Sequence, residues 1–74
     1  MKVRVLVRPK SGILDPQGEA VRRALPALGF NGVNAVHVGR LVEMEVDSAE
    51  EVDGMCRRLL ANPTIEEYEW EVLS

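Results

Sequence analysis

Residues 33–47, VNAVHVGRLVEMEVD, decide the fold, because they carry two alternations of apolar and polar residues around one glycine. The apolar residues of these alternations are Val36 and Val38, then Val42, Met44 and Val46. A period of two is typical of half-buried strands. Directly opposed residues of an antiparallel pair point to the same face of a sheet. The stretch therefore predicts a β-hairpin in which Val38 pairs with Val42 and Gly39-Arg40-Leu41 form a three-residue turn.

A helix is predicted before this hairpin. Asp15 suits an N-cap and Pro16 suits the first helical position, where a missing amide hydrogen removes no hydrogen bond. Pro26 should kink or shorten the last turn, and Gly29 should end the helix in a left-handed conformation. The spacing predicts a buried stripe comprising Val21, Ala24, Leu25 and Leu28.

A second helix is predicted after the hairpin. Ser48 and Glu51 have the spacing of a capping box, and Asn62-Pro63 should stop the helix. Its predicted apolar stripe comprises Val52, Met55, Cys56, Leu59 and Leu60. This stripe places Cys56 in the core as a structural thiol.

Strands are predicted at both ends of residues 1–74, which we interpret as one domain. Residues 2–8 alternate valines with mostly charged residues, and residues 66–73 alternate apolar side chains with glutamates. The order β-α-β-β-α-β predicts an α+β, ferredoxin-like two-layer sandwich. Its four-stranded antiparallel sheet should have the strand order 4-1-3-2, with both helices on one face.

The other face of this sheet would be open in a single copy of the chain. It is predicted to carry a central row of Arg4, Leu6 and Arg8 between the acidic side chains Glu43, Glu45, Glu67, Glu69 and Glu71. His37 should lie on it opposite Glu43. Two interpretations stay open: a solvated face held flat by cross-strand ion pairs, or a protein-binding surface with Leu6 near its middle.

Composition narrows the classes of partner. The net charge of -3 and the pI of about 5.0 argue against nucleic acid. No apolar run approaches the ~20 residues that span a bilayer, and the charged start does not resemble a signal peptide, so a cytoplasmic location is expected. One cysteine excludes an internal disulfide.

Catalytic, cofactor-binding and metal-ligating residues are not expected, because the sole histidine and cysteine lack suitable neighbours. A small phosphatase that uses Lys10 of the first loop, together with Arg8 just before that loop, is a weak enzyme alternative. A second alternative is a regulatory domain that binds a small metabolite at a dimer interface.

An ordered set of short motifs resembles a known family. It runs through Leu14-Asp15-Pro16-Gln17-Gly18, Val38-Gly39-Arg40 with Glu43, the stretch 55–63 (MCRRLLANP), Ile65-Glu66 and Tyr68. Together these residues resemble PurS, the small subunit of bacterial and archaeal phosphoribosylformylglycinamidine (FGAM) synthase. The family's usual basic residues around the glycine are represented by His37 and Arg40, and Pro26 is a departure from the pattern.

The resemblance implies a subunit of an ATP- and glutamine-dependent C–N ligase complex in purine biosynthesis. The complex uses ATP, Mg and glutamine: the PurQ glutaminase releases ammonia, and the PurL synthetase activates the substrate amide with ATP. The small subunit carries no chemistry of its own. It forms a homodimer or homotetramer, bridges PurL and PurQ, and assists ammonia transfer. The residues predicted to contact partners are Gln17, Arg40, Glu43, Arg57, Arg58, Arg4 and Leu6.

Overall fold

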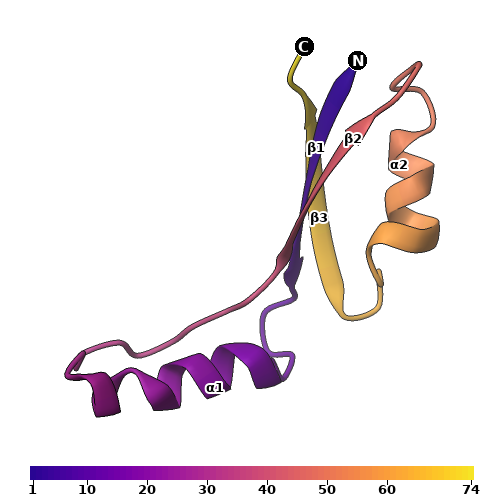
Figure 1. The fold of residues 1–74 in the computed structure, drawn as a ribbon. Helices are drawn as coiled ribbons and strands as arrows, with labels where there is room; N and C mark the ends of the chain where they lie inside the picture. Colours follow the sequence, from indigo (N-terminus) through magenta and orange to yellow (C-terminus); the bar gives the residue numbers. More distant parts are fainter.

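The computed structural model describes all 74 residues as a small sheet with one helix packed on it and a second helix held away from it (Figure 1). The strands form an antiparallel sheet in the order β2-β1-β3. The elements are β1 (Lys2–Pro9), α1 (Pro16–Ala24), β2 (Arg40–Glu45), α2 (Val52–Met55) and β3 (Glu66–Val72), with a 3₁₀ turn at Pro26–Leu28 and a π-helical turn at Cys56–Leu60.

The first strand is central, as predicted. Val5 lies opposite Val42 of β2 on one side and opposite Trp70 of β3 on the other. The side chains on the apolar face of β1 are buried, and the fully formed core comprises Val3, Val5, Val7, Val52, Cys56 and Ala61. The predicted pairings of the first strand with the third and the last are therefore confirmed.

The predicted hairpin over 33–47 is wrong. Arg40 pairs with Val7 and Leu41 pairs with Leu6, so the residues expected to turn instead continue the ladder with β1. Val38 does not pair with Val42, and residues 31–39 form no strand. The sheet consequently has three strands, and the four-stranded ferredoxin-like sandwich is not formed within one chain.

The first helix begins and ends as predicted but does not cover the sheet. Asp15 caps it by accepting a hydrogen bond from the Gly18 amide at 3.0 Å. The helix ends at Ala24, a 3₁₀ turn starts at Pro26, and Gly29 has φ 91°. We call residues 15–39 the arm, because α1 and the elongated segment after it project together from the sheet (Figure 1).

The arm gives the chain an elongated outline of 46 × 26 × 14 Å. The stripe predicted to be buried is largely in solvent, since Val21 is 42% exposed and Leu28 is 72% exposed. The prediction that this stripe is buried within the chain is therefore wrong, and none of its residues belongs to the core.

The second helix covers the valine face of the sheet. Val52 and Cys56 are buried as predicted, but Leu59 is 82% exposed. The cause is the π-helical turn, in which the Ala61 amide donates to the Cys56 carbonyl, five residues earlier, at 2.9 Å. The wider turn rotates the side chains between these residues away from their α-helical directions. Ser48 accepts from the Glu50 amide, so it caps a turn before α2 and not the predicted helix.

Candidate partner interfaces

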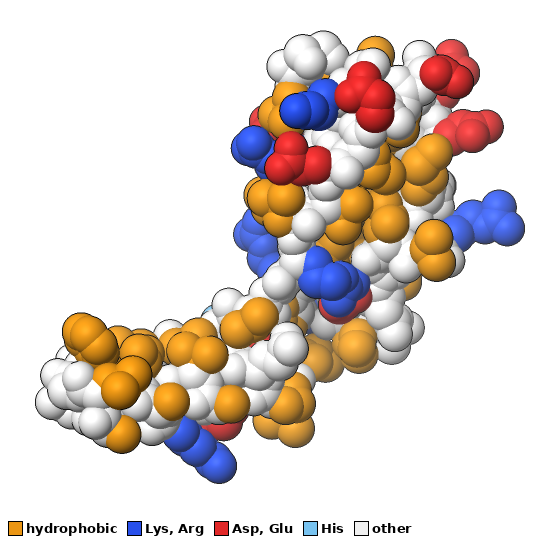
Figure 2. Space-filling view, viewed as in Figure 1, with side chains coloured by type: hydrophobic (Ala, Val, Ile, Leu, Met, Phe, Trp, Pro, Cys, Tyr) orange, Lys and Arg blue, Asp and Glu red, His pale blue; other side chains and the backbone are white.

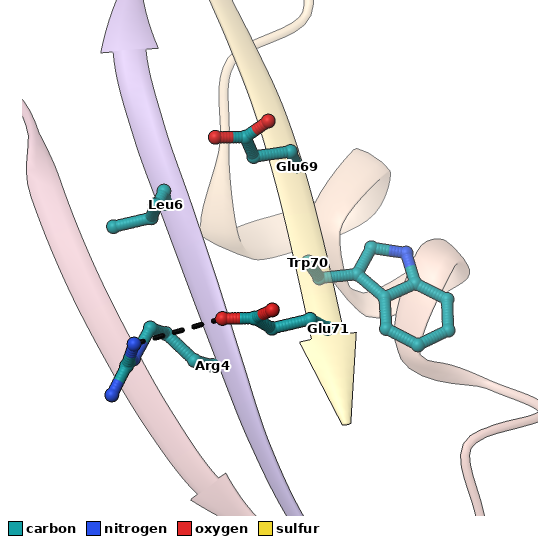
Figure 3. A pocket seen from close by; sticks show the side chains of 5 residues that line it. All are labelled: Arg4, Leu6, Glu69, Trp70 and Glu71. Carbon is teal, nitrogen blue, oxygen red and sulfur yellow. Dashed lines mark ion pairs between the residues drawn. The ribbon is translucent and has the colours of Figure 1, made fainter. Parts of the chain in front are cut away.

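The open face of the sheet, on the side away from α2, is one candidate interface. A shallow hollow of about 200 Å³ lies over it, lined by Arg4, Leu6, Glu69, Trp70 and Glu71 (Figure 3). Figure 3 shows Leu6 between charged side chains, with the Trp70 ring extending away from them. The structure thus brings the predicted partner residues Arg4 and Leu6 together.

Ion pairs hold the charges of this face in place. Arg8 lies 2.6 Å from Glu69, and Arg4 lies 3.6 Å from Glu71 (Figure 3). These side chains are 39–63% exposed, so each pair contributes little stability. Their effect is to set a fixed pattern of charge around Leu6, which suits a protein partner better than an enclosed substrate.

A second candidate interface lies where the arm leaves the sheet. We call it the elbow cleft, a groove of about 270 Å³ whose lining includes Ile13, Leu14, Pro16, Gln17, Val38, Gly39, Arg40, Ile65 and Glu66. Most of these residues belong to the short motifs singled out in the sequence, although those motifs lie far apart along the chain. Leu14 is 80% exposed, so the cleft offers an apolar side chain to a partner.

Asp15 fixes the arm at this elbow. Its Oδ1 accepts from the Gly18 amide, and its Oδ2 accepts from the Val38 amide at 2.8 Å. These two backbone hydrogen bonds hold the pKa of the carboxyl below its usual value. One carboxylate therefore ties the start of α1 to the segment that enters β2.

His37 lies beside this carboxylate and not opposite Glu43, which corrects the predicted placement. Its Nδ1 is 3.9 Å from Asp15 Oδ2, and its side chain is 67% exposed. The error follows from the missing hairpin, because only a reversal at Gly39 would bring residue 37 back beside residue 43.

Arg40 braces the sheet side of the elbow cleft. Its guanidinium donates to both carboxylate oxygens of Glu66 at 2.9 Å and to the Leu60 carbonyl at 2.8 Å. Glu66 also accepts from the Asn62 amide at 2.8 Å. The hydrogen bonds to Arg40 lower the pKa of Glu66, and those to Glu66 raise the pKa of Arg40. Arg40 was predicted as a partner contact, and its head group is engaged within the chain.

The other predicted contact residues lie apart from one another. Gln17 lines the elbow cleft, while Glu43 is the β2 residue opposite Arg4. Arg57 pairs with Asp53 at 3.0 Å, and Arg58 is exposed on the second helical segment. The set is therefore spread over the elbow, the open face and the outer side of α2.

Exposed apolar side chains form the feature that the sequence reasoning missed. The largest exposures are Leu14 at 80%, Leu28 at 72%, Phe30 at 59% and Leu59 at 82%. Figure 2 shows hydrophobic side chains gathered along the arm and beside α2. Contiguous exposed apolar surface of this kind marks a protein interaction site. The amphipathic period of α1 was the available signal, but it was assigned to an internal core.

Three other features bear on function: the reactivity of the thiol, the placement of metal-binding side chains and the length of the helices. Burial is the main cause that raises the pKa of the Cys56 thiol, which lowers its reactivity. No group of three or more His, Cys, Asp and Glu side chains is placed to hold a metal ion. None of the helices has the length and apolar character needed to cross a bilayer.

Comparisons with known proteins agree on one family. The model of the family described as PurS: Phosphoribosylformylglycinamidine (FGAM) synthase matches residues 2–74. The FGAM synthase subunit PurS of Methanocaldococcus jannaschii is 39% identical, with 96% of this chain and 93% of the relative covered. The PurS subunit of Bacillus subtilis is 41% identical, with 96% and 90% covered.

Solved structures give the same result. A crystal structure of B. subtilis PurS superposes with a TM-score of 0.90 at 40% identity, covering 99% of this chain and 98% of that one. The structure described as PurLQS from Thermotoga maritima matches with a TM-score of 0.77 at 32% identity, covering 97% and 95%. These matches confirm the resemblance carried by the short motifs: the chain belongs to the PurS family, as a subunit of phosphoribosylformylglycinamidine synthase in purine biosynthesis.

Proposed function

We propose that this chain is a non-catalytic bridging subunit that joins the PurL synthetase to the PurQ glutaminase and assists ammonia transfer between them. The observation that carries the proposal is the presence of two separate exposed surfaces, the open face around Leu6 and the arm with its elbow cleft. A bridging subunit needs at least two such surfaces. The relative described as PurLQS from T. maritima supports an assembly of this kind.

Ammonia transfer gives a physical reason for a small rigid bridge. Free ammonia becomes protonated in water and then loses its nucleophilic lone pair. The ion pairs on the open face and the Asp15 hydrogen bonds at the elbow keep both surfaces in fixed positions, so partners that dock on them can exclude water from their junction. Under this proposal, the ATP, Mg²⁺ and glutamine of the complex bind to the two larger subunits.

Self-association into a homodimer or homotetramer is part of the proposal. Only six hydrophobic residues are buried in the core of one copy. A chain of this length has roughly 4–11 kcal/mol of net stability when well packed, and so small a core supplies little of it. Burial of Leu28 and Phe30 against another copy would add the apolar contact that one chain lacks.

The test is reconstitution with purified glutaminase and synthetase subunits. Glutamine-dependent activity should require this chain, whereas activity with added ammonium should not, because external ammonia bypasses the bridge. Leu6→Glu should weaken assembly by placing a charge in the middle of the open face. Glu50→Gln, at an exposed position in the turn before α2, is the control and should leave assembly unchanged. Equal glutamine-dependent activity with and without the chain would refute the proposal.

A further inference from the structure

The outer edge of β3 has no strand of the chain beside it, because β3 pairs only with β1. The Lys10 amide donates to the Ile65 carbonyl at 2.9 Å, which sets the alternation of this ladder: odd-numbered residues of β3 direct their backbone groups toward β1. The amides and carbonyls of Tyr68, Trp70 and Val72 therefore point outward. Unpaired edges of this kind are templates for an added strand.

One side of β3 is an acidic row on the open face of the sheet. It consists of Glu67, Glu69 and Glu71, which lie opposite β1 residues of the same face. Glu69 pairs with Arg8 and Glu71 pairs with Arg4, yet both glutamate side chains are 63% exposed. Glu67 takes part in none of the ion pairs of the chain. The row thus has carboxylate oxygens available to further cations.

The other side of β3 is apolar and incompletely covered. Tyr68 and Trp70 are half-buried, and Val72 is 46% exposed. Figure 3 shows the Trp70 ring extending from β3 on the side away from β1. A strand added at this edge would cover apolar side chains on one face while it meets carboxylates on the other.

Contacts within the chain hold β3 in its extended form. The Tyr68 hydroxyl donates to Asp53 at 2.9 Å, and Arg57 pairs with the same carboxylate at 3.0 Å. At the start of the strand, Arg40 donates to both carboxylate oxygens of Glu66 at 2.9 Å. Because the edge is already ordered, a segment that binds it loses only its own conformational freedom.

We propose that the outer edge of β3 binds an extended segment of a protein partner as an added antiparallel strand, and that this segment alternates Lys or Arg with apolar residues. Its cations would lie opposite the acidic row, and its apolar side chains would lie beside Trp70 and Val72. This inference rests on the proposed bridging function, since it assigns the segment to one of the two larger subunits.

The first strand shows which chemistry suits β3. Arg4 lies opposite Glu71, and Val5 lies opposite Trp70, so β1 is itself a basic and apolar alternation paired with β3. The proposed segment repeats this pairing on the other edge of the same strand.

A second copy of the chain does not fit this edge. Two β3 strands paired antiparallel with their open faces matched would set glutamate opposite glutamate, and like charges directly opposite each other are destabilising. The basic strand β1 is central and paired on both sides, so it has no free edge to offer. Nucleic acid would be repelled by the acidic row. The charge pattern therefore favours a different polypeptide with a basic extended segment.

The fluorescence of Trp70, the sole tryptophan, tests this inference. The probe is a peptide with blocked ends and the sequence Arg-Val-Arg-Val-Arg-Val-Arg. It should shift the Trp70 emission to shorter wavelength, and its Kd should rise with added salt. The matched peptide with Glu in place of Arg should not bind.

A charge reversal measures the part played by the acidic row. Glu67→Lys breaks no ion pair within the chain and should raise the Kd of the basic peptide by about two- to tenfold. Glu50→Lys makes the same change of charge at an exposed position in the turn before α2, and should leave the Kd unchanged.

Hydrogen exchange distinguishes strand addition from a contact between charges alone. The basic peptide should slow exchange of the Tyr68, Trp70 and Val72 amides, whereas the Glu69 amide already faces β1 and should change little. Val72→Pro removes one outward amide and no hydrogen bond within the chain, and proline is tolerated at such edge positions. It should leave the chain folded and weaken peptide binding.

Three results would each overturn the inference: equal binding of the basic and the acidic peptide, absence of any change in Trp70 emission, or binding without slower exchange of the outward β3 amides. Slower exchange at Leu41 and Glu43 in their place would show that the peptide pairs with β2.

The outcomes separate this inference from the proposed function. If the chain supports glutamine-dependent synthesis but the peptide does not bind the β3 edge, the strand addition is wrong and the bridging function stands. If the peptide binds this edge but the complex does not need the chain, the bridging function is wrong and the basic-strand site stands.

Discussion

Replacing Gly18 by alanine has two opposite effects on stability: it raises the helix propensity of α1 and it creates a steric clash with a neighbouring segment. Alanine in a helix interior is ordinarily more stable than glycine by about 1 kcal/mol, because it loses less backbone freedom on folding. At Gly18 the new Cβ would overlap the Val36 carbonyl oxygen and lie 2.9 Å from the Asp15 Cγ. The carbonyl belongs to the backbone, so relief requires α1 to separate from residues 36–38.

The balance of these effects is destabilising. Overpacking costs about 1–3 kcal/mol, and a clash with backbone belongs in the upper part of that range. After subtracting the helix gain of about 1 kcal/mol, we expect Gly18→Ala to lower the free energy of unfolding by about 1–2 kcal/mol. Gly54→Ala is the matched control, because it lies in α2 with nothing within 4 Å of the added Cβ. It should raise the stability by about 0.5–1 kcal/mol.

Thermal unfolding at one fixed protein concentration measures the difference. At about 4–8 °C per kcal/mol for a chain of this size, Gly18→Ala should lower the Tm by at least about 4 °C, while Gly54→Ala should raise it. Hydrogen exchange of the Val38 amide should accelerate in Gly18→Ala alone, because that amide bonds to Asp15 at the displaced elbow. If both alanines raised the Tm equally, the close approach at Gly18 would not exist and the reasoning would be wrong.

Three further predictions concern single side chains. Val5→Ala removes two methyl groups from a fully buried position and should cost about 2–3 kcal/mol of stability in urea unfolding; a change below about 0.5 kcal/mol would contradict the assigned core. Hydrogen bonding and ion pairing with Arg22 lower the pKa of Glu19 from 4.5 to about 2. The stabilising effect of the ionised Glu19 is therefore complete above pH 4.5 and is lost as the pH falls toward 2. The helical circular dichroism signal should fall over that pH range in the natural chain, but not in Glu19→Gln. Burial raises the pKa of Cys56, so alkylation at pH 8 should be slow until urea unfolds the chain, and rapid alkylation of the native protein would contradict its position in the core.

The sequence predicted the parts of the fold that depend on neighbouring residues. The alternation around Val5 and the alternation around Trp70 predicted the strands β1 and β3, and Asp15 and Pro16 predicted the start of α1. These features depend on residues close together in sequence and not on contacts with a partner or with a distant segment. Arg4 and Leu6, which we predicted as partner contacts, were placed on the open face for the same reason, and the structure has them there.

The hairpin could not be predicted because alternation specifies a face and not a partner. Val38 and Val42 satisfy the same pattern whether the chain reverses at Gly39 or passes straight through it. The exposure of Leu59 depends on a π-helical turn, for which the apolar spacing gave no signal. The role of Arg40 depends on Glu66, which is distant in sequence and was singled out only as part of a motif.

The central place of β1 has a consequence for biosynthesis. Val3 and Val5 are made early, yet their neighbours on β3 are made at nearly the other end of the chain. During translation, one edge of β1 therefore has no strand to pair with until the residues of β3 have been made. Pairings between segments so distant in sequence slow folding and leave apolar surface exposed in folding intermediates, which makes them prone to aggregate. The sheet should consequently complete its folding only after the last strand has emerged from the ribosome.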